Sequence, residues 1–231
     1  MESTDRESDQ ASEPAEEELG TAAPSLLATE HWSLLAARGL IWNEAQSRVS
    51  VFLTVLSASM IALAFLADAT EFGTPTTIAA LVLLPVVFLL GVAAYVRLVD
   101  VNIEEFQLML AMNRLRHAYV DLEPGLKRYL TTGIHDDERG VFKSYMVHRP
   151  NRSSFWLYFL INTPTIVATV NSALAAAMAV VILQVVHAHT GWLIAGGIAA
   201  FVLVWILLFL LQRRTLKAFQ YDEPRFPSPP A

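Results

Sequence analysis

The sequence predicts an all-α, polytopic membrane protein: four transmembrane helices forming two hairpins, with cytoplasmic helical extensions and a short helical middle segment. The 231-residue chain is 54% hydrophobic and only 16% charged, whereas soluble domains carry about 25% charged residues. Four apolar stretches approach the roughly 20 residues needed to cross a bilayer core of about 30 Å, at residues 50–67, 76–98, 165–186 and 191–211. Apolar runs on every side argue against the alternative, a soluble four-helix core.

The basic residues predict the orientation of these spans. The two short connections, DATEFGTP (68–75) and HAHT (187–190), contain no lysine or arginine. Of the sixteen basic residues, three precede the first span, nine lie between Arg97 and Arg152, and four follow the last span. Because cytoplasmic segments near span ends keep positive charge, we expect both termini and the middle segment in the cytoplasm.

The N-terminal region divides into a tail and a helix. Residues 1–24 carry eight acidic side chains and little apolar surface, which predicts a disordered acidic tail and no secretory signal. Residues 25–49 place apolar side chains at heptad-like spacing and predict an amphipathic cytoplasmic helix leading into the first span. The alternative is that this helix lies flat at the lipid surface, with Trp32 and Trp42 as anchors.

The two transmembrane hairpins, 50–98 and 165–211, are expected to associate through small residues, because lipid competes equally well for large apolar side chains. Pro85 should kink the second span. Asn171 could bond to another helix or line a pore. The candidate packing residues are Ala58, Ala62, Ala168, Ser172, Ala176, Gly196 and Ala200.

The cytoplasmic segment 99–164 is expected to prolong the second span as far as Pro124. The first two spans are antiparallel, so their extensions run side by side and can bury their apolar stripes together. The arginines in this segment could meet anionic headgroups or a phosphate ligand, or belong to solvated helix faces. We predict Leu34, Trp42, Phe106, Arg114 and Arg116 as cytoplasmic interaction residues.

The stretch TTGIHDDERG, residues 131–140, gathers His135, Asp136 and Asp137 as candidate metal ligands. The alternative is helix capping, with Gly133 as a left-handed stop and one aspartate as the N-cap of the next helix. No second histidine follows His135 at the i+3 or i+4 spacing of a zinc face, and the chain has no cysteine. Capping is therefore favoured, and we predict neither a metal site nor a cofactor.

Residues 212–231 form the predicted cytoplasmic C-terminal tail. Its end, FQYDEPRFPSPPA, is rich in proline and should be extended. It is either a docking peptide or a frayed terminus, and we favour the frayed terminus.

The sequence argues against several activities. It lacks the phosphate-binding loop, the dinucleotide fingerprint and the HExxH zinc signature, which argues against an enzyme. The span interiors hold no ionisable residue, which disfavours coupled transport, and a nucleic-acid partner is not expected. We predict a structural or signalling protein that uses its cytoplasmic helices to bind a second copy or another membrane protein. The alternative is an oligomeric pore or membrane-permeabilising effector.

The stretches EHWSLLAARGLIWNEAQSR, RLRHAY and TTGIHDDERG, with the four-span layout, resemble a group of bacterial, particularly actinobacterial, integral membrane proteins of uncharacterised activity. The resemblance covers about residues 30–190. It implies the same fold and inner-membrane residence, and it brings no activity with it.

Overall fold

The computed structural model describes residues 20–145, 163–219 and 223–229. Within these ranges the chain is helical and has no strand, so the predicted all-α class is confirmed. The disorder expected for residues 1–24 falls mostly on residues 1–19, outside the described ranges, as do residues 146–162 of the middle segment. The helices are α1 (Ala23–Ala69), α2 (Thr74–Leu122), η1 (Pro124–Tyr129), α3 (Glu138–Ser144), α5 (Thr163–Val185) and α6 (Thr190–Ala218).

Each of the first two predicted spans is continuous with its predicted extension. α1 has 47 residues and α2 has 49, so at about 1.5 Å per residue each is roughly 70 Å long. That is more than twice the thickness of a bilayer core. α1 begins at Ala23, with Pro24 in its first turn, so the tail is shorter than predicted. α2 continues through Pro85.

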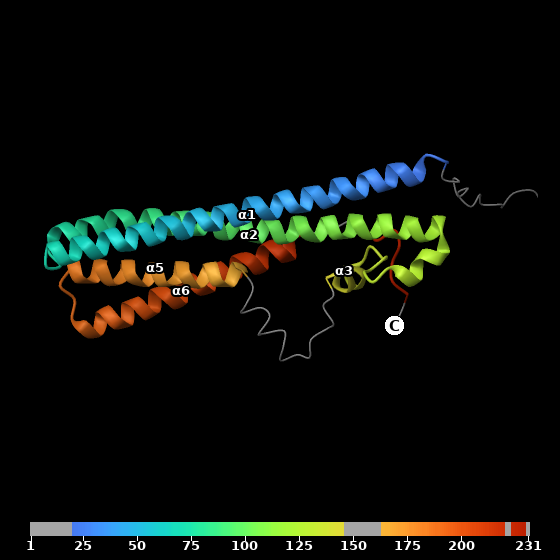
Figure 1. Cartoon of the computed structure of the whole chain (residues 1–231). Coiled ribbons are helices and arrows are strands. Elements are labelled where there is room, and N and C mark those ends of the chain that lie inside the picture. The colour runs from blue at the N-terminus through green and yellow to red at the C-terminus, as the bar shows by residue number, and fades with distance from the viewer. Residues whose placement is uncertain (1–19, 146–162, 220–222, 230–231) are drawn as a thin grey trace, which may run out of the picture.

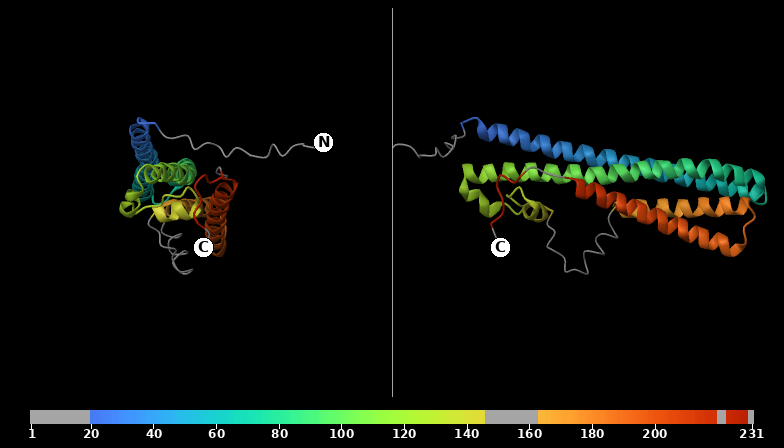
Figure 2. Two further views of the ribbon diagram at one scale, coloured as in Figure 1. Left: turned by 90° about the vertical axis from the view of Figure 1, so that its right-hand side faces the viewer. Right: turned by 180° about the vertical axis from the view of Figure 1, so that it is seen from behind.

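The helices form a long hairpin and a short one, with α2 at the centre. α2 contacts α1, α5, α6, η1 and α3. The α5–α6 hairpin lies beside the half of α1–α2 that ends in their connecting turn, and the other half of the long hairpin extends beyond it (Figure 1). We call this second part the protruding half; it comprises residues 23–49, 99–145 and the C-terminal segment 223–229, which lies against it (Figure 2).

Both connections at the far end of the hairpins are tight turns. Glu71 and Phe72 have positive φ angles of 48° and 59° and reverse the chain between α1 and α2. His187 has a φ of 53°, and the His189 ring accepts a 3.2 Å hydrogen bond from the Gly191 N–H to cap α6. These left-handed residues let each hairpin close within a few positions.

The four long helices are apolar enough to cross a membrane. Their outward faces carry large apolar side chains with little cover, for example Phe65, Val82, Ile194 and Leu203, which are 73%, 60%, 61% and 58% exposed. A soluble protein rarely exposes so extensive an apolar surface. The helices and their faces therefore support the predicted membrane class.

Five of the predicted packing residues, on α5 and α6, are buried or half-buried. Ala168 and Ser172 are buried and Ala176 is half-buried on α5. On α6, Gly196 is half-buried, and a Cβ there would overlap the Leu183 side chain; Ala200 is also half-buried. These five residues lie where the close packing of small residues is expected.

The prediction is wrong for α1 within this chain. Ala58 and Ala62 are both exposed, and the side of α1 that packs is the one that buries Phe52 and Ser59. Spacing four apart identifies a row of small residues but not the direction in which that row faces.

In the protruding half, α1 and α2 run side by side rather than separating at the membrane surface. Arg38 of α1 donates hydrogen bonds to Glu105 of α2, and the Tyr119 hydroxyl donates to the Leu27 carbonyl at 3.0 Å. The His31 and Tyr119 rings stack at 5.9 Å. The alternative in which residues 25–49 lie flat on lipid, apart from α2, is therefore not the arrangement in this structure.

Charged side chains mark the level at which the apolar bundle ends. Arg97 of α2 donates to Glu44 of α1 at 2.6 Å and also pairs with Glu104. At nearly the same level the Tyr95 hydroxyl donates to the Leu208 carbonyl of α6 at 2.8 Å, five residues before Arg213. The polar boundaries of α1, α2 and α6 thus coincide.

Candidate functional site

The protruding half holds a polar site built from α2, the loop that follows η1, and the C-terminal segment. The loop begins after η1, whose first residue is Pro124. It returns towards α2 because two glycines permit close backbone approach. A Cβ on Gly133 would overlap the Gly140 carbonyl, and a Cβ on Gly140 would overlap the His135 carbonyl. Gly133 is not the left-handed stop that we predicted, because no glycine in the described part has a positive φ.

Asn113 of α2 fixes this loop. Its side-chain Nδ2 donates to the His135 carbonyl at 2.8 Å, and its Oδ1 accepts from the Ser144 hydroxyl at 2.7 Å and from Arg116 at 2.8 Å. The Ser144 hydroxyl in turn accepts from the Gly133 N–H at 3.0 Å. Asn113 is fully buried, so these bonds form in a low-dielectric environment in which each is costly to lose.

Asp137 has the capping role that the sequence predicts for one of the two aspartates. It is the N-cap of α3, and its Oδ1 accepts from the Gly140 N–H at 2.8 Å. Glu138 follows in the first turn, where a negative charge complements the helix dipole.

Asp136 contacts α2 and the C-terminal segment. Its side chain is fully buried and pairs with Arg114 of α2, the Arg114 Nε lying 2.6 Å from Oδ2. The same carboxylate accepts from the backbone N–H groups of Phe226 at 2.8 Å and Arg225 at 3.1 Å. Asp136 therefore joins α2, the loop and the C-terminal segment.

The C-terminal segment 223–229 is held in this site and is not a frayed end, contrary to our expectation. The Ser228 N–H and hydroxyl both donate to Asp137 at 2.8 Å. The Phe226 ring stacks on His117 of α2 at 4.1 Å, and Arg139 donates to the Pro229 carbonyl at 3.3 Å. We call residues Arg114, His117, Asp136, Asp137 and Arg139 the tail clasp.

The hydrogen bonds of the tail clasp lower the pKa values of its two carboxyl groups. Burial raises the pKa of Asp136, but the bonds from Arg114, Phe226 and Arg225 outweigh it, so the net pKa lies below its ordinary value. For Asp137, burial likewise raises the pKa, and the bonds from Gly140 and Ser228 bring it below the ordinary value. Both aspartates are thus ionised at neutral pH.

The residues considered as metal ligands make other contacts in this structure. Across residues 20–145, 163–219 and 223–229, no three histidine, aspartate or glutamate side chains gather as a metal cluster. The oxygens of Asp136 and Asp137 accept hydrogen bonds from N–H and O–H donors. His135 contributes its backbone carbonyl to Asn113. This set of contacts suits a peptide backbone and its donors.

The five predicted interaction residues all make contacts inside the chain. Leu34 and Phe106 pack against the buried cluster of Met109, Leu110, Met112 and Val141, and Trp42 packs against the bundle core. Arg114 pairs with Asp136 and Arg116 with Asn113. The contacts of these five side chains help to hold α1, the loop and the tail on α2, and their role towards a partner stays a prediction.

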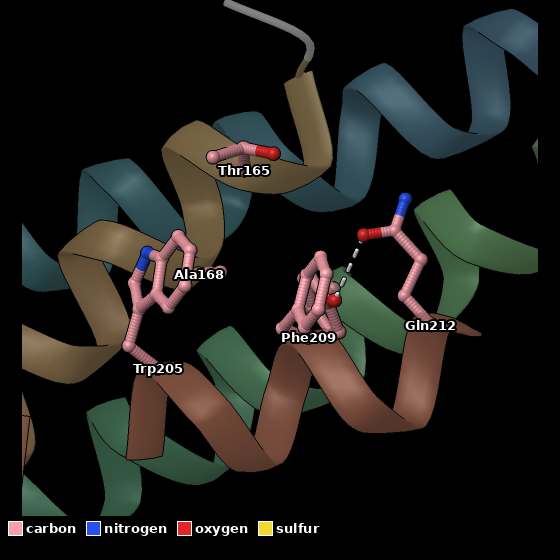
Figure 3. A pocket seen from close by; sticks show the side chains of 6 residues that line it. Thr165, Ala168, Trp205, Phe209 and Gln212 are labelled. Atoms are coloured by element: carbon pink, nitrogen blue, oxygen red, sulfur yellow. Dashed lines mark hydrogen bonds between the residues drawn. The ribbon is translucent and has the colours of Figure 1, made fainter. Parts of the chain in front are cut away.

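A small cavity also lies within the membrane bundle. The cavity drawn in Figure 3 lies between α2, α5 and α6 and has a volume of about 10 Å³, the space of about one water. The Tyr95 hydroxyl also approaches Gln212 Oε1 at 3.4 Å there. The cavity is too small for an organic ligand. Its lining residues are Tyr95, Thr165, Ala168, Trp205, Phe209 and Gln212.

Asn171 of α5 is one of several polar residues buried within the bundle. It is fully buried against Gly91 and Phe52, and neither side-chain atom has a hydrogen-bond partner among the described residues. The interhelical hydrogen bond that we considered for it is therefore not seen in that part of the chain.

Comparisons with protein-family models, curated proteins and solved structures find no match for this chain. The resemblance to bacterial four-span proteins stays a prediction, and the function must be inferred from the chain's own geometry.

Sequence reasoning missed the tail clasp, although two signals for it were present. Three prolines alternate with other residues in PRFPSP, and two adjacent aspartates offer more acceptors than one helix cap uses. Nothing in the sequence places these stretches together, because 90 positions separate Asp136 from Phe226.

Proposed function

We propose that this protein is a multi-pass protein of a bacterial plasma membrane, with both termini and residues 99–164 in the cytoplasm. We propose further that it acts as a structural or signalling protein by binding a second copy of itself along α1. The one-sided distribution of basic residues supports the orientation. The length of α1 and α2 supports a role outside the bilayer, because about half of each helix is not needed for crossing it.

The observation that carries the proposal is an exposed, uncharged face of α1. We call it the α1 outer face. It runs along the helix for more than seven turns within about a third of the circumference, and every member is exposed. Its members are Trp32, Ala36, Gly39, Leu40, Asn43, Ser47, Ser50, Thr54, Ser57 and Ala58.

The two ends of this face suit a protein partner for different reasons. In the bundle, small residues such as Ser50, Thr54 and Ala58 allow another helix to approach closely, which is how membrane helices associate without a hydrophobic driving force. In the protruding half, Trp32 and Leu40 are each 70% exposed on a helix that extends beyond the bundle. Bilayer lipid accounts for exposed apolar side chains within the bundle but not for these two.

A groove beside the α1 outer face adds to this argument. It has a volume of about 180 Å³ and lies between α1 and α2. Except for Ser47 and Arg48 its lining is apolar, so it can accept an apolar side chain from a neighbouring helix. The lining residues are Ser47, Arg48, Val51, Phe52, Leu90, Ala93 and Ala94. A second copy packed along α1 would cover this groove.

The test is the oligomer mass in mild detergent, measured by native mass spectrometry. We expect the wild-type chain to form a defined oligomer and Thr54→Phe to shift it towards monomer, because the ring prevents close approach of a second α1. Ala199→Phe is the matched control, since Ala199 is exposed on α6, and it should leave the mass unchanged. A monomeric wild type, or an unchanged oligomer in Thr54→Phe, would count against the proposal.

The orientation has its own test, made simple by the absence of cysteine from the chain. In intact cells, a membrane-impermeant thiol reagent should label Thr74→Cys, at the α1–α2 turn, and should not label Lys143→Cys in α3. Both positions are exposed. The reverse pattern would place the protruding half outside the cell.

One observation supports the alternative that the protein forms a pore. Ser50, Thr54 and Ser57 align on the α1 outer face, and an oligomer could turn them towards a central channel. However, the Thr54 and Ser57 hydroxyls each donate to the carbonyl four residues earlier at 2.8 Å. Their hydroxyl hydrogens are therefore satisfied within α1 and do not require water in a channel. Induced expression followed by entry of an impermeant dye would favour the pore; intact cells with correctly inserted protein would favour the interaction protein.

A further inference from the structure

The C-terminal segment is bound through its backbone, and its prolines determine which backbone N–H groups are present to form hydrogen bonds. In residues 224–229, prolines alternate with Arg225, Phe226 and Ser228, so only these three residues keep a backbone N–H. All three N–H groups donate to Asp136 or Asp137, at 2.8 to 3.1 Å. The adjacent carboxylates of Asp136 and Asp137 thus accept a hydrogen bond from every backbone N–H group of residues 224–229.

Side-chain contacts add selectivity at two positions. The Phe226 ring stacks on His117 at 4.1 Å, and the Ser228 hydroxyl donates to Asp137 at 2.8 Å. The chain direction is set by Arg139, which donates to the Pro229 carbonyl, and by the Asp136 N–H, which donates to the Phe226 carbonyl at 3.3 Å. An extended peptide with an aromatic residue and a hydroxyl residue two positions later satisfies these groups.

The clasp is held in place by residues outside the tail. Asp136 is paired with Arg114, Asp137 caps α3 through Gly140, and Asn113 fixes the loop through the His135 carbonyl. A site that is organised before its ligand arrives binds at a lower conformational cost.

We propose that the tail clasp is a binding site for an extended, proline-containing peptide, and that the chain's own residues 223–229 occupy it as an intramolecular competitor. The site is then closed to a peptide of the same chemistry offered by another molecule until the tail leaves. This inference goes beyond the proposed function and uses different residues from the α1 outer face, so either can fail without the other.

The tether explains how a short peptide stays bound. Phe219, just after α6, packs edge-on against Phe106 of α2 at 5.9 Å, and Phe226 reaches His117 seven residues later. Short tethers give effective concentrations on the order of millimolar. A segment with a dissociation constant of about 10–100 µM would therefore be almost fully docked within the chain.

The test uses a fluorescent synthetic peptide of residues 222–231 and polarisation measurements in detergent. We expect a chain lacking residues 223–231 to bind the peptide with a Kd on the order of 10–100 µM. The full-length chain should bind at least about tenfold more weakly, because its own tail competes. A peptide with Phe226→Ala and Ser228→Ala should lose binding to the shortened chain.

Matched variants separate the clasp from general charge and folding effects. In the shortened chain, Asp136→Asn should abolish peptide binding, whereas Glu138→Gln, which removes the same charge at an exposed neighbouring position, should preserve it. A full-length chain carrying Phe226→Ala and Ser228→Ala keeps its length and should bind the peptide as the shortened chain does.

Two results would overturn the proposal. Absence of peptide binding in both the shortened chain and the full-length double variant, with helical circular dichroism intact, would show that the clasp is not a peptide site. Equal binding by the wild-type and shortened chains would show that the tail does not compete. Neither result depends on the oligomer mass, so the outcome is separate from the test of the α1 outer face.

Discussion

Asp136 and Phe226, which are 90 positions apart, exchange two hydrogen bonds: the Phe226 N–H donates to Asp136 Oδ1 at 2.8 Å, and the Asp136 N–H donates to the Phe226 carbonyl at 3.3 Å. This pair connects the chain after the last transmembrane helix to the loop carried by α2. Movement of α6 relative to α2 would therefore act on the loop through the tail.

Replacing Asp136 by asparagine should release the tail. The asparagine keeps one acceptor but loses the charge that pairs with Arg114, and its amide hydrogens oppose the donors at Arg225 and Phe226. We expect the docked segment to lose about 1–3 kcal/mol. Hydrogen exchange at the Phe226 and Ser228 amides should accelerate accordingly. Glu138→Gln is the control, and unchanged protection in Asp136→Asn would contradict the geometry.

Acid should also release the tail. The pKa values of Asp136 and Asp137 are lowered when the tail is docked, so the carboxylates stabilise docking above the ordinary carboxyl pKa of about 3.9. That contribution is lost as the pH falls through the lowered values. The fluorine NMR shift of 4-fluorophenylalanine at position 226 should stay constant from about pH 8 to 5 and move to its free value below about pH 4. A change confined to higher pH would assign the effect to another group.

The packing of α1 on α2 in the protruding half can be tested at Arg38 and Glu105. Glu105 is buried, at 7% exposure, and Arg38 bonds to it. Removing one partner leaves a buried charge unpaired, whereas removing both does not. In a double-mutant cycle with Arg38→Met and Glu105→Gln, we expect a coupling free energy of about 0.5–3 kcal/mol, from thermal unfolding in detergent. Additive effects would mean that residues 25–49 do not lie along α2 in solution.

A larger residue at position 91 should destabilise the bundle while Asn171 is present. A Cβ at position 91 would overlap the Asn171 side-chain oxygen and lie 2.7 Å from the Phe52 ring, so Gly91→Ala should cost about 1–3 kcal/mol through overpacking. Asn171→Ala in the same chain should recover part of that loss. The midpoint of thermal unfolding measures both effects. Gly191→Ala, where the added Cβ would make an ordinary 3.5 Å contact with the His189 ring, should be neutral or stabilising, and an equal loss there would refute the packing explanation.

Several features followed from local sequence because short-range physics fixes them. The apolar stretches defined four membrane helices, and helical periodicity continued α2 to the residues before Pro124. Pro124 begins η1 and Asp137 caps α3, because a proline in a first turn and a carboxylate at an N-cap need only their immediate neighbours.

Other features required contacts that spacing does not encode. The row containing Ala58 faces outward, because the other side of α1, with Phe52, fits α2 better. Gly133 serves close backbone approach to Gly140 and not a left-handed turn. Arg114, which looked solvated or ready for a phosphate, pairs with Asp136.

The sequence by itself determined that this chain is helical, how many of its helices are apolar enough to cross a bilayer, and where its local caps lie. Only the tertiary structure decided that the C-terminal segment occupies the loop at Asp136 and Asp137, and which face of α1 stays uncovered. The physical reason is that hydropathy and capping act over one or two helical turns. A hydrogen bond between positions 136 and 226 depends instead on the packing of every helix between them.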